Sequence, residues 1–220
     1  MTSRSEVSSV DLVGCSVVCV SHATGSGGEE IGRQVAGKLG YLYVDEEIVV
    51  RAAAEGGLAP ADIADEERRK SFASRFLNVL AENGGDAWTL STHSAVTMEG
   101  ARPADVRDLI RETVVQTAGR GSVVIVAHAA SFAVEPGPHV LRVLVTAPPA
   151  VRASRIAGAD GLDSADAERT IKDSDAGRQD YLKRFYSVDR ESPTDYDLIV
   201  NTDHVSVEQA AEIILGAANR

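Results

Sequence analysis

A glycine-rich turn between the first apolar run and the first helical pattern is the segment best suited to chemistry. Its sequence is Ser21-His-Ala-Thr-Gly-Ser-Gly-Gly28. Successive small residues let neighbouring backbone N–H groups close around an anion, and the N-terminus of the following helix adds partial positive charge. The turn therefore predicts a phosphate-binding site. A plain tight strand-to-helix connection is the alternative that the glycines alone leave open.

The turn differs from a Walker A loop, which needs Gly-x-x-x-x-Gly-Lys-Ser/Thr. With Gly27 on the second glycine, His22 takes the first glycine position, Gly28 the lysine position and Glu29 the hydroxyl position. The lysine would neutralise the outer phosphates and the hydroxyl would hold magnesium. Glu29 and Glu30 stabilise a helix N-terminus but repel a phosphate. The candidate phosphate contacts are Thr24, Gly25, Ser26, Gly27, Gly28, Glu29 and Glu30.

Five short apolar runs are the expected strands. Four of them are near-continuous in Val, Ile and Leu, which is typical of strands buried on both faces of a parallel sheet. Helical patterns alternate with them, so the sequence predicts a doubly wound α/β domain around a five-stranded parallel sheet. The runs are Cys15–Ser21, Tyr41–Val44, Ser122–His128, Val140–Thr146 and Asp197–Asn201.

Three helices are marked clearly. The first covers Glu29–Leu39 and ends at Gly40, a C-terminal stop. The second covers Val106–Ala118. The last begins at Ser206 with a capping-box pattern. Its expected buried residues are Ala210, Ile213, Ile214 and Ala217.

Two further stretches follow strand ends, where α/β proteins bind ligands. Glu46–Pro103 is long and polar, and Pro149–Tyr196 is charged and predicts two helices joined near Ala157–Ser164. Residues 1–11 are polar and Ser-rich, so we expect a disordered lead-in before a single domain over 12–220.

Charge and composition exclude several classes of function. The formal net charge of −11 disfavours a surface for a nucleic acid polymer, and no apolar stretch is long enough to span a membrane. Cys15 and Cys19 would lie about 13 Å apart on one face of a strand, too far for a disulfide. Two buried free cysteines indicate a reducing compartment, so we expect a cytoplasmic protein.

Several segments together resemble the cytidylate-kinase-like family. Members commonly show Gly-Ser-Gly-Gly-Arg-Glu-Ile at the turn, so the missing lysine is a family trait and Glu29 replaces an arginine. The match covers most of Val17–Leu215 except roughly Glu55–Ala104. The similar segments are Gly25–Ile31, Lys38–Tyr41, Tyr43–Ile48, Ser122–Ala130, Val145–Pro149 with Arg152 and Arg155, Lys172–Arg178, and Tyr196–Thr202 with the aromatic residues before it.

The resemblance implies a P-loop fold of the nucleoside-monophosphate-kinase type. Residues 46–105 would form an acceptor-binding helical insert, and residues 149–192 a lid that carries arginines. The implied reaction moves the γ-phosphoryl group of ATP to CMP or dCMP with Mg²⁺. Catalysis of this kind is mostly positioning and charge neutralisation, so the lid arginines matter.

The resemblance also assigns roles to residues. Arg178 would contact phosphate and Asp175 the pyrimidine nucleoside, and their three-residue spacing puts both on one helix face. A surface ion pair is the alternative. Arg152 is a further catalytic candidate, and Arg155 is a candidate for contact with the donor nucleotide. Helix-surface arginines without a role remain the alternative for both.

Three other positions carry open alternatives. Asp45 could hold a ribose or an arginine of the acceptor site, or could cap a following helix. His128 stands where the family has an arginine for the acceptor phosphate, and histidine is shorter and mostly neutral at pH 7. Arg33 could reach back toward the turn, although a solvent-facing position is favoured. The histidines show no ligand spacing, so we expect no metal site held by the protein.

Two classes of function follow. The first is a cytidylate-kinase-like phosphotransferase with weak or lost activity. The second is a non-catalytic nucleotide-binding or regulatory module on the same fold, which we expect to be homo-oligomeric, a homodimer being the simplest case. A structural role for the Glu55–Pro103 segment as an interface is a third hypothesis.

Overall fold

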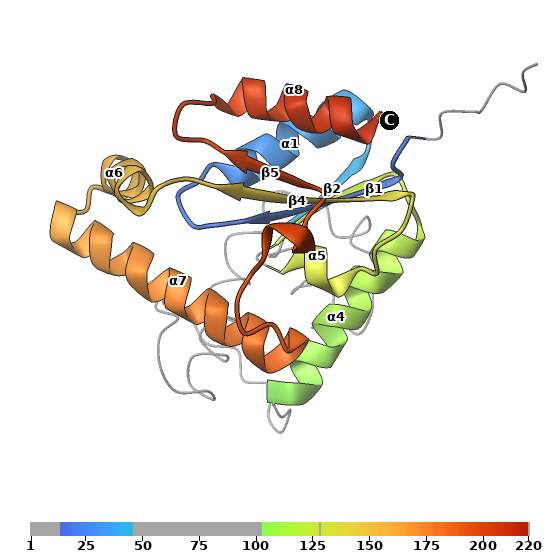
Figure 1. Ribbon diagram of the computed structural model, residues 1–220, viewed down its shortest axis with the longest axis horizontal. Helices are drawn as coiled ribbons and strands as arrows, with labels where there is room; N and C mark the ends of the chain where they lie inside the picture. The colour runs from blue at the N-terminus through green and yellow to red at the C-terminus, as the bar shows by residue number, and fades with distance from the viewer. Residues whose placement is uncertain (1–13, 46–102, 128, 220) are drawn as a thin grey trace, which may run out of the picture.

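The computed structural model describes residues 14–45, 103–127 and 129–219 (Figure 1). Within these ranges, five strands form one sheet in which every pairing is parallel, in the order β2-β3-β1-β4-β5. The strands are β1 (Val17–His22), β2 (Leu42–Asp45), β3 (Val123–Val126), β4 (Val140–Thr146) and β5 (Leu198–Asn201). The predicted five-stranded parallel sheet is therefore confirmed, with strand boundaries that differ from the predicted ones by at most two residues.

Helices cover both faces of the sheet. In Figure 1, α1 (Gly28–Leu39) and α8 (Val207–Ala218) lie on one face, and α4 (Pro103–Gly119) and α5 (Ala130–Ala133) lie on the other. After β4 the chain forms α6 (Pro149–Asp160) and then α7 (Ser164–Tyr186), followed by the short 3₁₀ helix η3 (Pro193–Asp195). This is the doubly wound arrangement that the alternating patterns predict.

Two local signals explain how the helices flanking the sheet begin and pack. The capping box at Ser206 is present, because Ser206 and Gln209 exchange side-chain-to-backbone hydrogen bonds. In α1, a Cβ on Gly32 would lie 2.3 Å from Cγ2 of Val126, so glycine lets the helix approach β3 closely. Close approach of α1 fixes the turn that precedes it.

The central strands β1 and β3 are buried on both faces, but β4 alternates. Along β4, Leu141, Val143 and Val145 are buried, whereas Leu144 is only partly covered. The expectation of full burial is therefore wrong for β4, and also for the edge strand β5, in which Ile199 is 41% exposed. One face of the C-terminal half of β4 borders a cavity, described below, and the apolar run does not distinguish a cavity wall from a core.

Two predictions of side-chain placement are also wrong. Cys15 lies before β1 begins and packs in the core cluster with α1 and α8, whereas Cys19 packs in the cluster on the opposite face. The two-residue period does not extend to Cys15, so the cysteines do not share a face, although both are buried and free as expected. Ile213 of α8 is 46% exposed, because the buried stripe runs through Ala211 and Leu215 instead.

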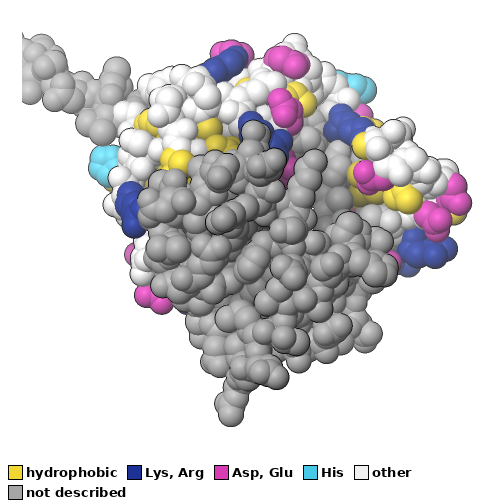
Figure 2. Space-filling view, turned by 180° about the vertical axis from the view of Figure 1, so that it is seen from behind, with side chains coloured by type: hydrophobic (Ala, Val, Ile, Leu, Met, Phe, Trp, Pro, Cys, Tyr) yellow, Lys and Arg dark blue, Asp and Glu magenta, His cyan; other side chains and the backbone are white. Residues whose placement is uncertain are grey.

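No helix within the described ranges is both long and apolar enough to cross a membrane. Figure 2 shows that on one face, where side chains are described, acidic and basic groups are interspersed without a continuous basic area.

Candidate functional site

The glycine-rich turn adopts a conformation that leaves a row of backbone donors available. Gly25 and Gly27 are left-handed, with φ of 76° and 84°, and α1 begins at Gly28. The Ser26 hydroxyl donates to the Val145 carbonyl at 3.1 Å, which ties the turn to β4. Within the described part of the chain, the N–H groups of residues 27–30 have no hydrogen-bond acceptor. The turn thus has the geometry of an anion-binding nest at a helix N-terminus.

The position that corresponds to the Walker lysine cannot carry a side chain in this structure. A Cβ on Gly28 would lie 2.3 Å from Cβ and 2.6 Å from Cγ of His22. His22 itself occupies the position of the first Walker glycine. The two substitutions therefore depend on each other, because the side chain at one site fills the space that a lysine at the other would need.

Arg152 of α6 joins the turn to α7. Its guanidinium donates to the Thr24 carbonyl at 3.2 Å and to both carboxylate oxygens of Asp175, at 3.0 and 2.6 Å. Nε also donates to the Ala147 carbonyl at 2.9 Å. Arg152 is 3% exposed, so this charge is held in a buried site by a bidentate pair.

Arg155, one turn further along α6, holds the other end of the turn. It donates to the Gly25 carbonyl at 3.4 Å and to the hydroxyl and carbonyl of Thr202, at 3.0 and 2.6 Å. The Thr202 hydroxyl donates in turn to the Ser26 carbonyl at 2.9 Å. Arg155 thus links the turn to the residues that follow β5.

Arg178 of α7 contacts the start of the turn. It is 6% exposed, donates to the His22 carbonyl at 3.3 Å, and forms a bidentate pair with Glu191 at 2.9 and 2.6 Å. It also donates to the Tyr196 hydroxyl at 3.2 Å. Arg152, Arg155 and Arg178 therefore each bind a different carbonyl of the turn, and two of them are paired with carboxylates.

The charges around Arg178 alter two pKa values. Burial lowers the pKa of Arg178, but the hydrogen bond and the charge of Glu191 outweigh this effect and raise it overall. Burial and the hydrogen bond from its hydroxyl to Glu191 raise the pKa of Tyr196 well above its ordinary value. Arg178 thus stays charged and Tyr196 neutral at any physiological pH.

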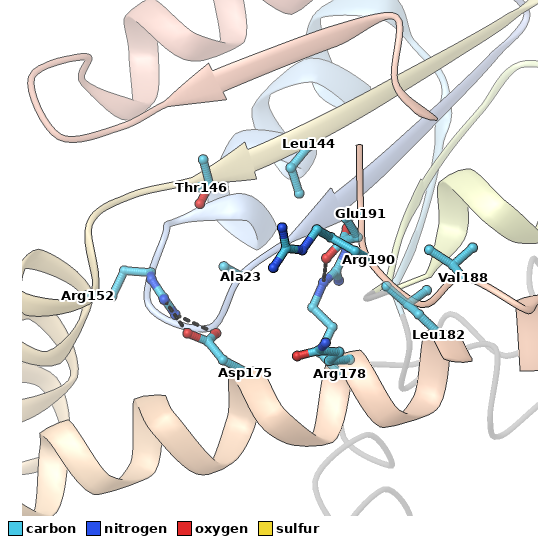
Figure 3. A pocket seen from close by; sticks show the side chains of 11 residues that line it. Ala23, Leu144, Thr146, Arg152, Asp175, Arg178, Leu182, Val188, Arg190 and Glu191 are labelled. Atoms are coloured by element: carbon cyan, nitrogen blue, oxygen red, sulfur yellow. Dashed lines mark hydrogen bonds and ion pairs between the residues drawn. The ribbon is translucent and has the colours of Figure 1, made fainter. Parts of the chain in front are cut away.

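A cavity of about 350 Å³ lies between the turn, the end of β4 and α7 (Figure 3). Its walls combine apolar side chains with three arginines and two carboxylates. The lining residues are Ala23, Leu144, Thr146, Arg152, Asp175, Arg178, Gln179, Leu182, Val188, Arg190 and Glu191. Its volume is at the small end of the range for small-molecule sites.

The structure brings together most of the predicted site residues but not all. Arg152, Asp175 and Arg178 line the cavity, and Arg155 and the Gly25 region adjoin it through hydrogen bonds. Asp45 ends β2, two strands away from β1, and is not among the cavity residues. His128 lies outside the described residues.

The acidic residues that open α1 form ion pairs within that helix. Glu29 and Glu30 are exposed and pair with Arg33 at 3.5 and 3.8 Å, and the Arg33 guanidinium lies over the Tyr43 ring at 5.3 Å. Arg33 is therefore on the exposed side of α1, the position favoured from the sequence. Its pairs partly neutralise the charge that Glu29 and Glu30 place near the turn.

Sequence reasoning missed Arg190, Glu191 and Thr202. All three lie in the loop before β5 or just after that strand, where they are close to the turn in space but far from it in sequence. The similarity of this segment to the family was recognised, but it does not indicate which charged side chain turns inward. No local sequence pattern marks any of the three as a site residue.

The comparisons with known proteins agree with this geometry. The model of the cytidylate kinase-like family matches residues 17–204, which include the turn, the cavity and all five strands. The chain belongs to the cytidylate kinase-like family. A cytidylate kinase of Ignicoccus hospitalis is 28% identical over 198 residues, which are 90% of this chain and 96% of that protein.

A second relative matches a shorter part of the chain. The cytidylate kinase of Aeropyrum pernix is 36% identical over 103 residues, which are 47% of this chain and 59% of that protein. The alignment therefore spans only about three fifths of this relative's length.

Solved structures resemble the fold at low sequence identity. An uncharacterized protein from Eubacterium ventriosum has a TM-score of 0.66 at 14% identity and covers 92% of this chain and 98% of its own. Shikimate kinase from Bacteroides thetaiotaomicron has a TM-score of 0.50 at 15% identity, with 91% and 96% covered. With the parallel sheet and the glycine turn, these likenesses identify a P-loop kinase fold.

Proposed function

We propose that this kinase-like protein transfers the γ-phosphoryl group of ATP to CMP, dCMP or a related small acceptor. An oxygen of the acceptor phosphate would attack the γ-phosphorus, the bond to the β–γ bridging oxygen would break, and ADP would leave. The family membership and the relatives that are called cytidylate kinases support the choice of acceptor.

One observation carries the proposal. The N–H groups at the start of α1 have no acceptor among the described residues, while the carbonyls of His22, Thr24 and Gly25 are each bound by an arginine. The arginines thus fix the turn through its carbonyls and leave its donors for an anion. A turn built only to reverse the chain would not need three guanidinium groups.

The turn fits a phosphate chain better than it fits a metal ion. All three hydroxyls of the turn are engaged: Ser21 with the Ser131 hydroxyl at 3.0 Å, Thr24 with the Ser174 hydroxyl at 2.6 Å, and Ser26 with a carbonyl of β4. Glu29 replaces the hydroxyl residue and pairs with Arg33. No cluster of metal-binding side chains occurs in the described ranges. ATP would therefore bring Mg²⁺ already held by its phosphates and water, and residues 46–105 and 149–192 would serve as acceptor insert and lid.

A non-catalytic nucleotide-binding module is the second candidate. The steric conflict at Gly28 keeps a lysine out of the turn. In addition, the carboxylates of Asp175 and Glu191 neutralise Arg152 and Arg178, two cations that a kinase would use on its substrate. A protein with these features could bind a nucleotide without transferring phosphate. A homodimer and a cytoplasmic location remain parts of both proposals.

An assay of phosphoryl transfer separates the two candidates. The full-length protein is incubated with ATP, Mg²⁺ and each nucleoside monophosphate, and ADP and the new diphosphate are quantified. We expect CDP or dCDP to form in amounts equal to ADP, and Arg178→Gln to lose most of this activity. Arg184→Gln is the matched control, because Arg184 is on the same helix and, within the described part of the chain, pairs only with the exposed Asp180.

Two other outcomes would count against the proposal. Nucleotide binding without any diphosphate would favour the non-catalytic module. Absence of binding for ATP, CMP and CDP at millimolar concentration, measured by calorimetry, would exclude both candidates.

A further inference from the structure

The side chains that line the cavity carry one positive charge more than they carry negative charges. Three of the lining residues are arginines and two are carboxylates. Asp175 pairs with Arg152 at 2.6 Å, and Glu191 pairs with Arg178 at 2.6 Å. Asp175 accepts from both terminal nitrogens of Arg152, and Glu191 accepts from Nε and one terminal nitrogen of Arg178, so each carboxylate is already engaged in a bidentate pair. The remaining charge is that of Arg190.

The acidic neighbours of Arg190 are engaged elsewhere. Asp189, on one side in sequence, pairs with Lys183 at 3.0 Å. Glu191, on the other side, is held by Arg178 and by the Tyr196 hydroxyl. Arg190 makes no hydrogen bond or ion pair with any residue in the described ranges.

The backbone around Arg190 is nevertheless fixed. The Val188 N–H donates to the Leu182 carbonyl at 3.2 Å, and the Gln179 side chain donates to the Asp189 carbonyl at 3.3 Å, so the loop is attached to α7. The Glu191 side chain anchors the following residue. A fixed backbone with an unpaired side chain limits where the guanidinium can go, and in Figure 3 it extends into the cavity between Leu144 and Arg178.

We propose that Arg190 is the residue that contacts the phosphate of the bound nucleotide in this cavity, an inference that rests on the proposed function. A phosphomonoester or the terminal phosphates of a triphosphate supply the negative charge that the cavity lacks. A guanidinium group can donate two parallel hydrogen bonds to such a phosphate. Because no ion pair must break first, Arg190 can bind an anion at lower cost than Arg152 or Arg178.

Binding measurements on the full-length protein test the inference. Isothermal titration compares CMP, ATP and the uncharged nucleoside cytidine for wild type, Arg190→Gln and the control Arg184→Gln. We expect Arg190→Gln to weaken binding of a phosphate-bearing ligand roughly 10- to 100-fold, the loss typical for a hydrogen bond to a charged group. Cytidine binding should not change, and Arg190→Lys should recover part of the affinity. A loss confined to CMP assigns Arg190 to the acceptor, and a loss confined to ATP assigns it to the donor.

A stability measurement separates this role from a structural one. Arg190 has no partner in the described structure, so Arg190→Gln should leave the thermal midpoint within about 1 °C of wild type, consistent with a surface substitution. Unchanged affinities for both CMP and ATP in Arg190→Gln would overturn the inference, as would an equal loss in Arg184→Gln.

The inference and the proposed function can fail separately. If wild type binds nucleotides without forming a diphosphate and Arg190→Gln weakens that binding, phosphoryl transfer fails and the role of Arg190 stands. If CDP forms and the KM values of Arg190→Gln match those of wild type, phosphoryl transfer stands and the role of Arg190 fails. If no phosphate-bearing ligand binds to wild type at millimolar concentration, both fail.

Discussion

At the scale of single residues, the contact between His22 and Gly28 accounts for two unusual positions of the turn at once. A lysine at residue 28 needs a small residue at 22, and a side chain at 22 needs glycine at 28. Neither change can be reversed alone without displacing the other side chain or the turn. The absence of the Walker lysine is therefore built into the packing of the turn.

The steric pair gives a prediction for stability. Gly28→Ala should lower the free energy of unfolding by about 1–3 kcal/mol, the usual cost of overpacking, and the loss should shrink when His22 is also changed to glycine. Gly37→Ala is the control on the same helix, because a Cβ there meets no atom within 4 Å. It should be neutral or stabilising by up to about 1 kcal/mol. Urea unfolding of wild type, Gly28→Ala, His22→Gly and the double variant gives the coupling, with Gly37→Ala measured alongside. Equal costs for Gly28→Ala with and without His22 would contradict the steric account.

Tyr196 gives a prediction for alkaline pH. Burial and the hydrogen bond to Glu191 raise its pKa in the folded protein, so the unfolded chain ionises first. Stability from this group is fully present below the unfolded value of about 10 and is lost as the pH rises above it. We therefore expect Tyr196→Phe to lose less free energy of unfolding than wild type between about pH 8 and pH 11. Urea unfolding at the two pH values measures this difference. Identical losses would show that Tyr196 titrates alike in both states.

At the scale of secondary-structure elements, α6 and α7 are joined to the turn by side chains rather than by the sheet. Arg152 connects α6 to α7 through Asp175, and the Thr24 and Ser174 hydroxyls connect the turn to α7. Ala153, Ala167 and Ile171 add a small apolar cluster between the two helices. The pair of helices thus forms a unit of its own whose polar face meets the turn.

The Arg152–Asp175 pair should contribute more to the free energy of unfolding than an exposed ion pair on α7. Asp175→Asn leaves the buried Arg152 without its counter-charge, and since the Asp175 side chain is 41% exposed we expect a loss of only about 1–3 kcal/mol. Asp180→Asn, which breaks the exposed pair with Arg184, should cost about 0.5 kcal/mol or less. Chemical unfolding of both variants tests the comparison. Equal losses would show that burial of Arg152 adds nothing.

Much of the secondary structure was predictable from the sequence. The apolar runs, the 3.6-residue periods, the glycine stops and the capping box at Ser206 are local signals, and the described strands and helices appear where they indicate. The spacing of Asp175 and Arg178 correctly predicts that both point to one side of α7, since both line the cavity. Their partners, Arg152 and Glu191, come from other elements, and no local pattern specifies which charges will meet.

At the scale of the whole molecule, order along the chain predicted the parallel sheet but not the cavity. Leu144 and Val143 belong to one apolar run, yet Val143 is in the core and Leu144 lines the cavity. Their difference depends on how α7 passes over the end of β4. Arg190 was missed for the same reason, because its contact with the cavity depends on the path of the loop before β5.

Ligand binding should raise the free energy of unfolding of the whole domain. A nucleotide that binds only the folded protein raises the free energy of unfolding by about 2.7 kcal/mol at 100 times its Kd. We expect CMP or ATP to raise the thermal midpoint in a concentration-dependent manner and cytidine to have little effect. In Arg190→Gln the same shift should need a higher concentration of nucleotide. A shift of equal size with cytidine would indicate that the phosphate contributes nothing.

The three arginines that bind the carbonyls of the turn also tie its order to the position of α6 and α7. Any motion that draws these helices away breaks the hydrogen bonds to His22, Thr24 and Gly25 together. The turn and the two helices should therefore open as one cooperative unit. In native-state hydrogen exchange, the hydrogen-bonded amides of α1 from Ile31 onward, the first of which donates to the Gly27 carbonyl, and those of α7 would then exchange with a common opening free energy, below that of the central strands β1 and β3.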